Sequence, residues 1–454
     1  MTEKKIQEYL WKNRERFWEL IEEIDIPAKR VIDNPDTIQP ADIIYNNLVE
    51  KFKDYYNDIF TLDLFGCEVP LKKDNDSTIR ADFLATMDSK GGISIIELKK
   101  NKQTERQAYT ELLAYGSHIR TVFSPMSKMD VNYVLISPME ERIVREATIQ
   151  SFLFDNIYVF ALIPEYTNDD LNTLKLKPWI PTFTEVNQVI SSVFSESNFD
   201  VFKITWDALP GEWSPLNKGE NPDSYMIERL NKVSEYAAQM MSEKGIHGFT
   251  YASQTWSELI DSGYLLNSLV ICGLNPFKAS KNRYLINDCG VKLEEASEID
   301  ISMINLLDII PELKYNSQKI NEDNNYFEDL SNSWDSTLWS IGFEVVDILT
   351  MSTNRDYIET GHGGGISWKQ YQEFSREDVY CHNFDIKMSG LIKELFFGYS
   401  KVDYEFMREN GQNKHPIYSA FGVPEDFVDL IGNQYVSRGF IKRLFYSDEY
   451  NTDS

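Results

Sequence analysis

Residues 79–99 constrain the fold of this 454-residue chain more than any other segment. The run Ile93–Ile96 is mostly β-branched and apolar, and the preceding run DSKGG is rich in turn formers, so two antiparallel strands joined by a turn are predicted. Because side chains alternate between the faces of a strand, Glu97 and Lys99 point the same way, and Asp82 on the partner strand reaches that face. The hairpin therefore predicts two carboxylates and one lysine in one small space.

The elements expected after this hairpin alternate between helix and strand. Thr104 is a suitable N-cap, with Gln107 at the third position after it as in a capping box, so a helix is predicted to follow. A strand, an amphipathic helix and a second strand are then predicted at Val131–Ser137, Glu140–Phe154 and Ile157–Ile163. The predicted fold class is α/β (α+β), with a mixed N-terminal sheet flanked by helices.

This succession of elements, together with the three charged residues, resembles the core of the PD-(D/E)xK nucleases, the restriction-endonuclease-like superfamily. The resemblance implies that Asp82 and Glu97 hold a divalent metal ion and that Lys99 lies beside the attacking water. The proline that precedes the first acid in the family is replaced here by Ala81. The resemblance is confined to the N-terminal part of the chain, and it implies a nuclease domain there.

One branch of this superfamily, which includes archaeal flap and mismatch endonucleases and the nuclease domains of recombination helicases, suggests supporting residues. Its N-terminal helix carries a further Glu, which makes Glu3 in the helical stretch Glu3–Leu10 a candidate fourth acid, with Glu50 as its rival. In the helix after the hairpin, where that branch carries a Gln or Tyr, the candidates are Gln107, Glu111 and Tyr115. Glu111 stands where a Gln would stand in a Q-x-x-x-Y pattern, so the role of this helix stays open.

These residue types suit phosphodiester hydrolysis with Mg²⁺, or with Mn²⁺ in its place. Divalent ions activate water and neutralise charge on the phosphate, and Mg²⁺ usually takes only one or two protein carboxylates. Asp82 and Glu97, with the backbone carbonyl of Leu98, therefore suffice as metal ligands. Lys99 is expected to orient or help deprotonate the water and to offset negative charge. The positive side chains expected to contact phosphates are Arg80, Lys100, Lys102 and Arg106.

The net charge of −27 argues against a broad basic surface for nucleic acid. Residues 1–165 carry 21 basic and 28 acidic side chains and the remainder 24 and 44, so the acidity belongs mostly to the second half. The N-terminus is charged and amphipathic, no long apolar run occurs, and the four cysteines form no C-x-x-C pair. These features predict a cytoplasmic protein without a signal peptide, a membrane span, a zinc ribbon or a disulfide framework.

The length of the chain predicts two domains. Residues 1–165 are expected to form the nuclease-like domain, 166–185 a linker, and 186–454 an acidic, mainly helical mixed domain with a sensor, regulatory or partner-binding role. Helices of that second domain are expected at Ser224–Lys244, Gln254–Ser268, Asp335–Met351, Ile386–Phe397 and Pro424–Ile431. The string around His362 resembles the glycine-rich oxyanion loop of esterases, but no G-x-S-x-G accompanies it, so a flexible loop is expected there.

The sequence therefore favours a metal-dependent endonuclease, with DNA as the preferred substrate and antiviral defence or DNA processing as its role. The alternative is a non-enzymatic protein that keeps the nuclease fold as a scaffold, whose acidic surface binds a basic partner or mimics DNA. An enzyme of this kind is expected to bind a protein partner or an activating ligand through its acidic domain and not to bind membranes. Cleavage of both strands of a duplex would call for a homodimer, although no dimer interface is legible in the sequence.

Overall fold

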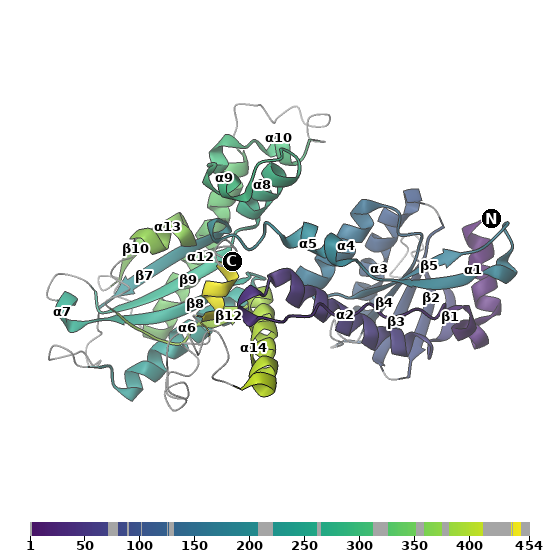
Figure 1. Ribbon diagram of the computed structural model, residues 1–454, viewed down its shortest axis with the longest axis horizontal. Coiled ribbons are helices and arrows are strands. Elements are labelled where there is room, and N and C mark those ends of the chain that lie inside the picture. Colours follow the sequence, from purple (N-terminus) through teal and green to yellow (C-terminus); the bar gives the residue numbers. More distant parts are fainter. Residues whose placement is uncertain are drawn as a thin grey trace. The chain divides into compact units, whose positions relative to one another are not determined.

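The chain folds into two compact units, each built around its own β-sheet (Figure 1). The first unit contains Met1–Val31 and Ala41–Val189, and the second contains Ile32–Pro40 and Ile190–Ser454. This computed structural model describes residues 2–70, 80–88, 90–100, 102–124, 126, 131–207, 221–260, 265–311, 326–350, 358–374, 381–411, 437 and 439–445.

The first unit contains a mixed six-stranded sheet in which the strands lie in sequence order. Its strands are β1 (Asp63–Pro70), β2 (Arg80–Met87), β3 (Lys90–Leu98), β4 (Val131–Ile136), β5 (Val159–Glu165) and β6 (Lys175–Trp179). Strands β2 and β3 form the predicted antiparallel hairpin, β3, β4 and β5 are parallel, and β6 returns antiparallel to β5. The order of hairpin, helix, strand, helix and strand is therefore confirmed, together with the mixed α/β class.

Helices cover both faces of this sheet. They are α1 (Glu3–Lys12), α2 (Pro40–Ile59), α3 (Lys102–Val122), α4 (Arg142–Phe154) and α5 (Phe183–Ile190). The apolar side chains of α1 and α2 share one core with Ile96 and Leu98, whereas α3 and α4 share another core with Ile95. Because Glu97 lies on the same side of β3 as Ile95, its side chain faces α3. Helix α3 begins at Lys102, two residues before the predicted cap Thr104.

The predicted linker is wrong, because residues 166–185 belong to the first unit. Strand β6 lies within this stretch and pairs with β5 from Ala161–Trp179 to Glu165–Lys175. Its residue Leu176 and the preceding Leu174 are buried in the core shared with α1 and α2. The stretch contains two prolines and several Asn and Asp residues, which are typical of loops, so its short edge strand was not predicted. The boundary between the units falls after Val189.

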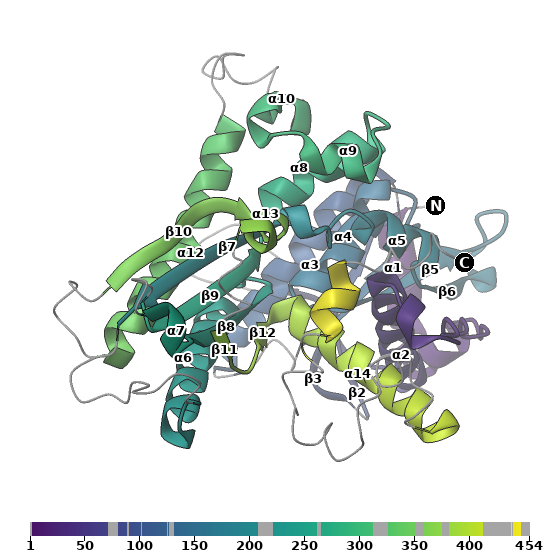
Figure 2. The same ribbon diagram turned by 60° about the vertical axis from the view of Figure 1, so that its left-hand side comes forward.

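The second unit contains an antiparallel sheet in the order β10-β7-β9-β8-β11, with β12 also paired to β8. The strands are β7 (Phe199–Trp206), β8 (Gly248–Thr255), β9 (Asn267–Leu274), β10 (Ile358–Ser367), β11 (Cys381–Asn383) and β12 (Lys387–Ser389). The helices are α6 (Ser224–Glu243), α7 (Ser257–Ile260), α8 (Pro276–Asn287), α9 (Leu293–Glu298), α10 (Leu306–Ile309), α12 (Tyr326–Thr350), α13 (Trp368–Phe374) and α14 (Gly390–Asn410). Helices α6 and α12 pack on one face of the sheet through a shared apolar core (Figure 2).

The second unit is mixed and mainly helical, as predicted, but none of its strands was predicted. The helix predicted at Gln254–Ser268 is wrong, since the end of β8, the short helix α7 and the start of β9 occupy the described part of this stretch. The glycine loop around His362 is instead part of β10, which pairs irregularly with β7. The helix predicted at Pro424–Ile431 lies outside the described residues.

The segment Ile32–Pro40, which we call the strap, belongs to the second unit although its neighbours in sequence belong to the first. Its backbone carbonyls accept hydrogen bonds from two side chains: Tyr399 Oη donates to Ile38 O at 3.2 Å, and Arg443 Nη1 donates to Pro35 O at 3.3 Å. Arg443 also forms a buried two-pronged ion pair with Asp403, at 2.8 and 2.6 Å. Helix α14 lies beside the yellow helical segment that carries Arg443 (Figure 2).

Candidate active site

The carboxylate of Asp82 closes the end of the β2–β3 ladder. The ladder pairs Phe83 with Ile96, and beyond this point the Leu98 N–H donates to Asp82 Oδ2 at 2.8 Å instead of to a backbone carbonyl. On the other edge of β3, the Lys99 N–H donates to Ile136 O of β4 at 2.8 Å. The Asp82 side chain thus accepts the hydrogen bond that a backbone carbonyl would accept in a continued ladder. Its carboxylate therefore lies where β2 and β3 separate.

Lys99 lies between carboxylates from two elements. Its Nζ is 2.5 Å from Glu97 Oε1 on β3 and 2.9 Å from Glu111 Oε2 on α3. Only 2% of Glu97 and 8% of Lys99 are exposed to solvent, so these charges interact with little screening by water. Gln107 Nε2 donates to Glu111 Oε1 at 2.7 Å and thereby orients this carboxylate. The predicted trio and two of the predicted supporting residues on α3 therefore lie together.

A cavity of about 490 Å³ lies over these groups. It is lined by Glu68, Arg80, Asp82, Glu97, Lys99, Thr110, Glu111, Ala114 and Tyr115. Four of these side chains are acidic and two are basic, so the lining has an excess of negative charge. A phosphate entering the cavity would need further positive charge beside it.

Burial and mutual repulsion perturb the carboxyl groups of this site. Burial raises the pKa of Glu97 strongly, and the nearby Asp82 carboxylate adds to the rise. Burial also raises the pKa of Asp82, against the opposing effect of the Leu98 N–H. For Lys99, burial by itself would lower the pKa, but the contacts with Glu97 and Glu111 outweigh it and raise the pKa above its ordinary value. The ammonium therefore stays charged at neutral pH.

This site offers a buried carboxylate oxygen to a divalent cation, but its described residues do not offer three protein ligands. Glu97 Oε2 is buried and accepts no hydrogen bond from the described residues, although a buried carboxylate oxygen normally has a donor or a cation beside it. Within the described residues, no three or more His, Cys, Asp and Glu side chains are arranged to hold a metal ion. Mg²⁺ commonly takes only two protein carboxylates and fills its remaining positions with water and substrate oxygens. Asp82 and Glu97 supply such a pair.

Helix α1 contributes one residue that the sequence predicted and one that it missed. Glu3 Oε2 accepts a hydrogen bond from the Lys100 N–H at 3.2 Å, so this candidate fourth acid holds the backbone just after Lys99. Gln7 Nε2 donates to Asp82 Oδ1 at 2.7 Å. The sequence signal for Gln7 was a lone amide between Ile6 and Leu10 on the apolar side of the helix. The rival acid Glu50 forms an ion pair with Lys29 and does not line the cavity.

The predicted phosphate-contacting residues differ in their placement. Arg80 lines the cavity and forms a 3.0 Å ion pair with Glu68, both side chains being about half exposed. Lys100 is partly exposed and follows directly after Lys99. Lys102 and Arg106 lie in the first turns of α3, and their side chains fall outside the described residues.

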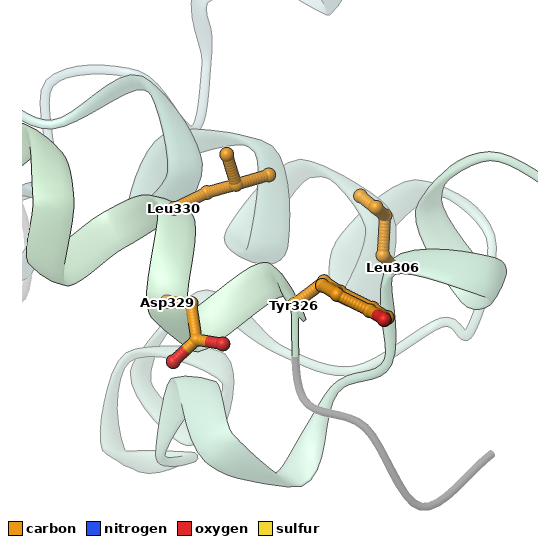
Figure 3. A pocket seen from close by; sticks show the side chains of 4 residues that line it. All are labelled: Leu306, Tyr326, Asp329 and Leu330. Atoms are coloured by element: carbon orange, nitrogen blue, oxygen red, sulfur yellow. The ribbon is translucent and has the colours of Figure 1, made fainter. Parts of the chain in front are cut away.

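A second cavity, of about 350 Å³, lies between α10 and the start of α12 in the second unit (Figure 3). It is lined by Leu306, Tyr326, Asp329 and Leu330. Its lining is almost wholly apolar, and its described residues supply one carboxylate and no cationic side chain. This cavity therefore differs in chemistry from the cavity of the first unit, whose lining carries four acidic and two basic side chains.

The second unit also buries a polar network between β7, α8 and α12. Asn275 Nδ2 donates to Asp200 Oδ2 at 2.6 Å, to Ser331 Oγ at 2.9 Å and to Asp335 Oδ1 at 3.3 Å. Lys278 forms an ion pair with Asp200. Because this network supplies its own cation and its own amide donor, we assign it to the stability of the fold.

Comparisons with protein-family models, with curated proteins and with solved structures find no match to this chain. Among the helices of the described residues, none combines the length and the apolar character needed to cross a membrane.

Proposed function

We propose that the first unit is a metal-dependent nuclease that hydrolyses phosphodiester bonds, with DNA as its preferred substrate. The observation that carries this proposal is the convergence of Asp82, Glu97 and Lys99 on one cavity of about 490 Å³. Carboxylates at the end of two neighbouring strands, with an ammonium in contact with one of them and an open cavity above, suit a cation and a phosphate entering together. The preference for DNA rests on the resemblance to PD-(D/E)xK nucleases.

Asp82 and Glu97 are the residues that would hold Mg²⁺ in this proposal. The ion, when bound, supplies charge neutralisation at the phosphate and lowers the pKa of a water molecule. Asp82 enters this role already oriented, because its two oxygens accept hydrogen bonds from the Leu98 N–H and from Gln7. Glu97 offers its buried Oε2, which accepts no hydrogen bond from the described residues.

Lys99 acts in this proposal as a fixed positive charge and hydrogen-bond donor. Two carboxylates hold its ammonium and keep its pKa above the ordinary value, so it does not serve as a general base. This narrows the role that the sequence suggested, in which Lys99 either oriented the water or helped to deprotonate it. A compact ammonium beside the cavity stabilises charge that develops on the phosphate oxygens.

The proposal is tested by incubating the full chain with plasmid, linear duplex DNA, single-stranded DNA and RNA, with Mg²⁺, with Mn²⁺ and with a chelator. We expect cleavage only with metal, and a loss of at least about 100-fold in Asp82→Ala and Lys99→Ala, since each removes a group that stabilises the transition state. The matched controls are Asp54→Ala and Lys53→Ala on the exposed side of α2, which should cleave at the wild-type rate. Equal cleavage by the wild type and the site variants, or a wild type that takes up no Mn²⁺ in calorimetry, would contradict the proposal.

A further inference from the structure

Gln7 is a buried polar side chain whose position suggests a specific task. Only 6% of it is exposed, and its neighbours Ile6 and Leu10 on α1 are fully buried in the core. Burying an amide costs free energy unless its polar atoms are hydrogen-bonded. The 2.7 Å bond from Gln7 Nε2 to Asp82 Oδ1 gives the amide nitrogen such a partner.

This hydrogen bond completes the hold on the Asp82 carboxylate. Gln7 on α1 donates to Oδ1, and the backbone N–H of Leu98 on β3 donates to Oδ2 at 2.8 Å. With a donor from a different element on each oxygen, the plane of the carboxylate is fixed against rotation. Each oxygen has two acceptor positions, so both oxygens keep one position for a cation.

Helix α1 makes a second contact on the same side. Glu3 lies one turn before Gln7 and accepts the Lys100 N–H at 3.2 Å. The helix is thus linked to the chain on both sides of Lys99: Gln7 bonds the Asp82 carboxylate that accepts the Leu98 N–H, and Glu3 accepts the Lys100 N–H. We propose that α1 clamps the catalytic hairpin and that Gln7 is the positioning residue that orients Asp82 to bind a divalent cation. This inference rests on the proposed function, which makes Asp82 a metal ligand.

A neutral amide has the properties that this task requires. A lysine or arginine at position 7 would neutralise Asp82 and compete with the cation, and a carboxylate there would repel Asp82. The amide donates one hydrogen bond and adds no charge. Partners that orient a metal ligand in this way typically change the metal affinity by about 10–100-fold.

The experiment measures Mn²⁺ binding to the full chain by titration calorimetry, without substrate. Gln7→Met keeps the length of the side chain but removes the donor. We expect this variant to bind Mn²⁺ about 10–100-fold more weakly than the wild type. The matched control is Glu8→Met, an exposed neighbour on α1, which should bind Mn²⁺ as the wild type does.

A Gln7→Met chain that binds Mn²⁺ within twofold of the wild type would overturn the inference while leaving the proposed function intact. A wild type that binds no Mn²⁺ would overturn both. Cleavage provides a second readout, since excess Mn²⁺ should restore the rate of Gln7→Met and leave its KM for DNA unchanged. A loss of rate that persists at saturating Mn²⁺ would contradict a role in orienting the metal ligand.

A double-mutant cycle with Asp82→Asn keeps the inference testable if Gln7→Met alone does not fold. In the metal-free chain, Gln7→Met leaves a buried carboxylate without its donor, whereas the same change combined with Asp82→Asn does not. The double variant should therefore regain fold and urea resistance relative to Gln7→Met, with effects that are far from additive. Additive effects, or a double variant that stays unfolded, would show that Gln7 acts through packing alone.

Discussion

Glu111 Oε2 on α3 lies 2.9 Å from Lys99 Nζ, at the end of β3, and ties the helix to the β2–β3 hairpin. Glu111→Leu removes this anchor, so we expect DNA cleavage to fall at least about tenfold, because Lys99 then loses one of its two ion-pair partners. Glu111→Gln keeps an oxygen for the ammonium and should retain more activity than Glu111→Leu. Cleavage rates at saturating Mg²⁺ measure the difference, with Glu8→Leu on the exposed side of α1 as the control. Equal rates for both Glu111 variants would contradict an anchoring role.

Lys99 also contributes to stability, because its ammonium contacts the carboxyl groups of both Glu97 and Glu111. Lys99→Met leaves these acids side by side without a cation, and breaking a buried ion pair in this way costs about 3–5 kcal/mol. We therefore expect the urea midpoint to fall clearly, whereas Lys53→Met on the exposed side of α2 should leave it unchanged. A Lys99→Met chain as stable as the wild type would mean that one of the acids has moved away or taken up a proton at no cost.

The buried network of the second unit predicts a dependence of stability on pH. Burial first, and then the hydrogen bond to Asp200, raises the pKa of Asp335 from 3.8 to about 8. The stability that this carboxyl group contributes is therefore fully present below about pH 4 and is lost as the pH rises through about 8.

Asp335→Asn stays neutral at every pH and should flatten this dependence, by at most about 1.4 kcal/mol per pH unit for one proton. Urea unfolding at pH 5, 6, 7 and 8 measures the slope. Asp329→Asn, an exposed change on the same helix, is the control and should follow the wild type. A slope that is unaltered in Asp335→Asn would assign the titration to another group.

The strap depends on the buried ion pair of Arg443 and Asp403, whose side chains are 7% and 9% exposed. Arg443→Met leaves Asp403 buried without its partner and frees the carbonyl of Pro35, so we expect a loss of about 3–5 kcal/mol in unfolding free energy. Arg443→Lys should not rescue this loss, because an ammonium cannot reproduce the two-pronged contact. Arg408→Met, exposed on α14, is the control. Wild-type stability of Arg443→Met would show that the strap is held by other contacts.

The hairpin of the first unit was predictable because its signals are local. The apolar, β-branched run before Glu97 and the turn ahead of it specify two strands, and strand alternation places Glu97 and Lys99 on one side. The tertiary contacts of the site have no such signal. The bond from Gln7 to Asp82 joins residues 75 positions apart, and nothing in the sequence around either residue indicates its partner.

The strands of the second unit were not predicted from the sequence, because polar side chains buried in the sheet form hydrogen bonds with each other. Ser253 and Ser268 share a hydrogen bond of 2.6 Å, and Gln254 Nε2 donates to Asn267 Oδ1 at 3.3 Å. These side chains are buried, although a strand with so many polar residues shows no apolar alternation. Cross-strand partners, which only the folded structure brings together, offset their cost of burial.

The strap has a consequence for the way such a protein can be taken apart or recombined. Because Ile32–Pro40 belongs to the second unit while Met1–Val31, which carries Gln7, belongs to the first, neither unit is one uninterrupted stretch of sequence. A cut after Val189 separates the strap from Tyr399 and Arg443. The two units are therefore not interchangeable cassettes, and a gene that replaced one of them would have to exchange two separate segments together.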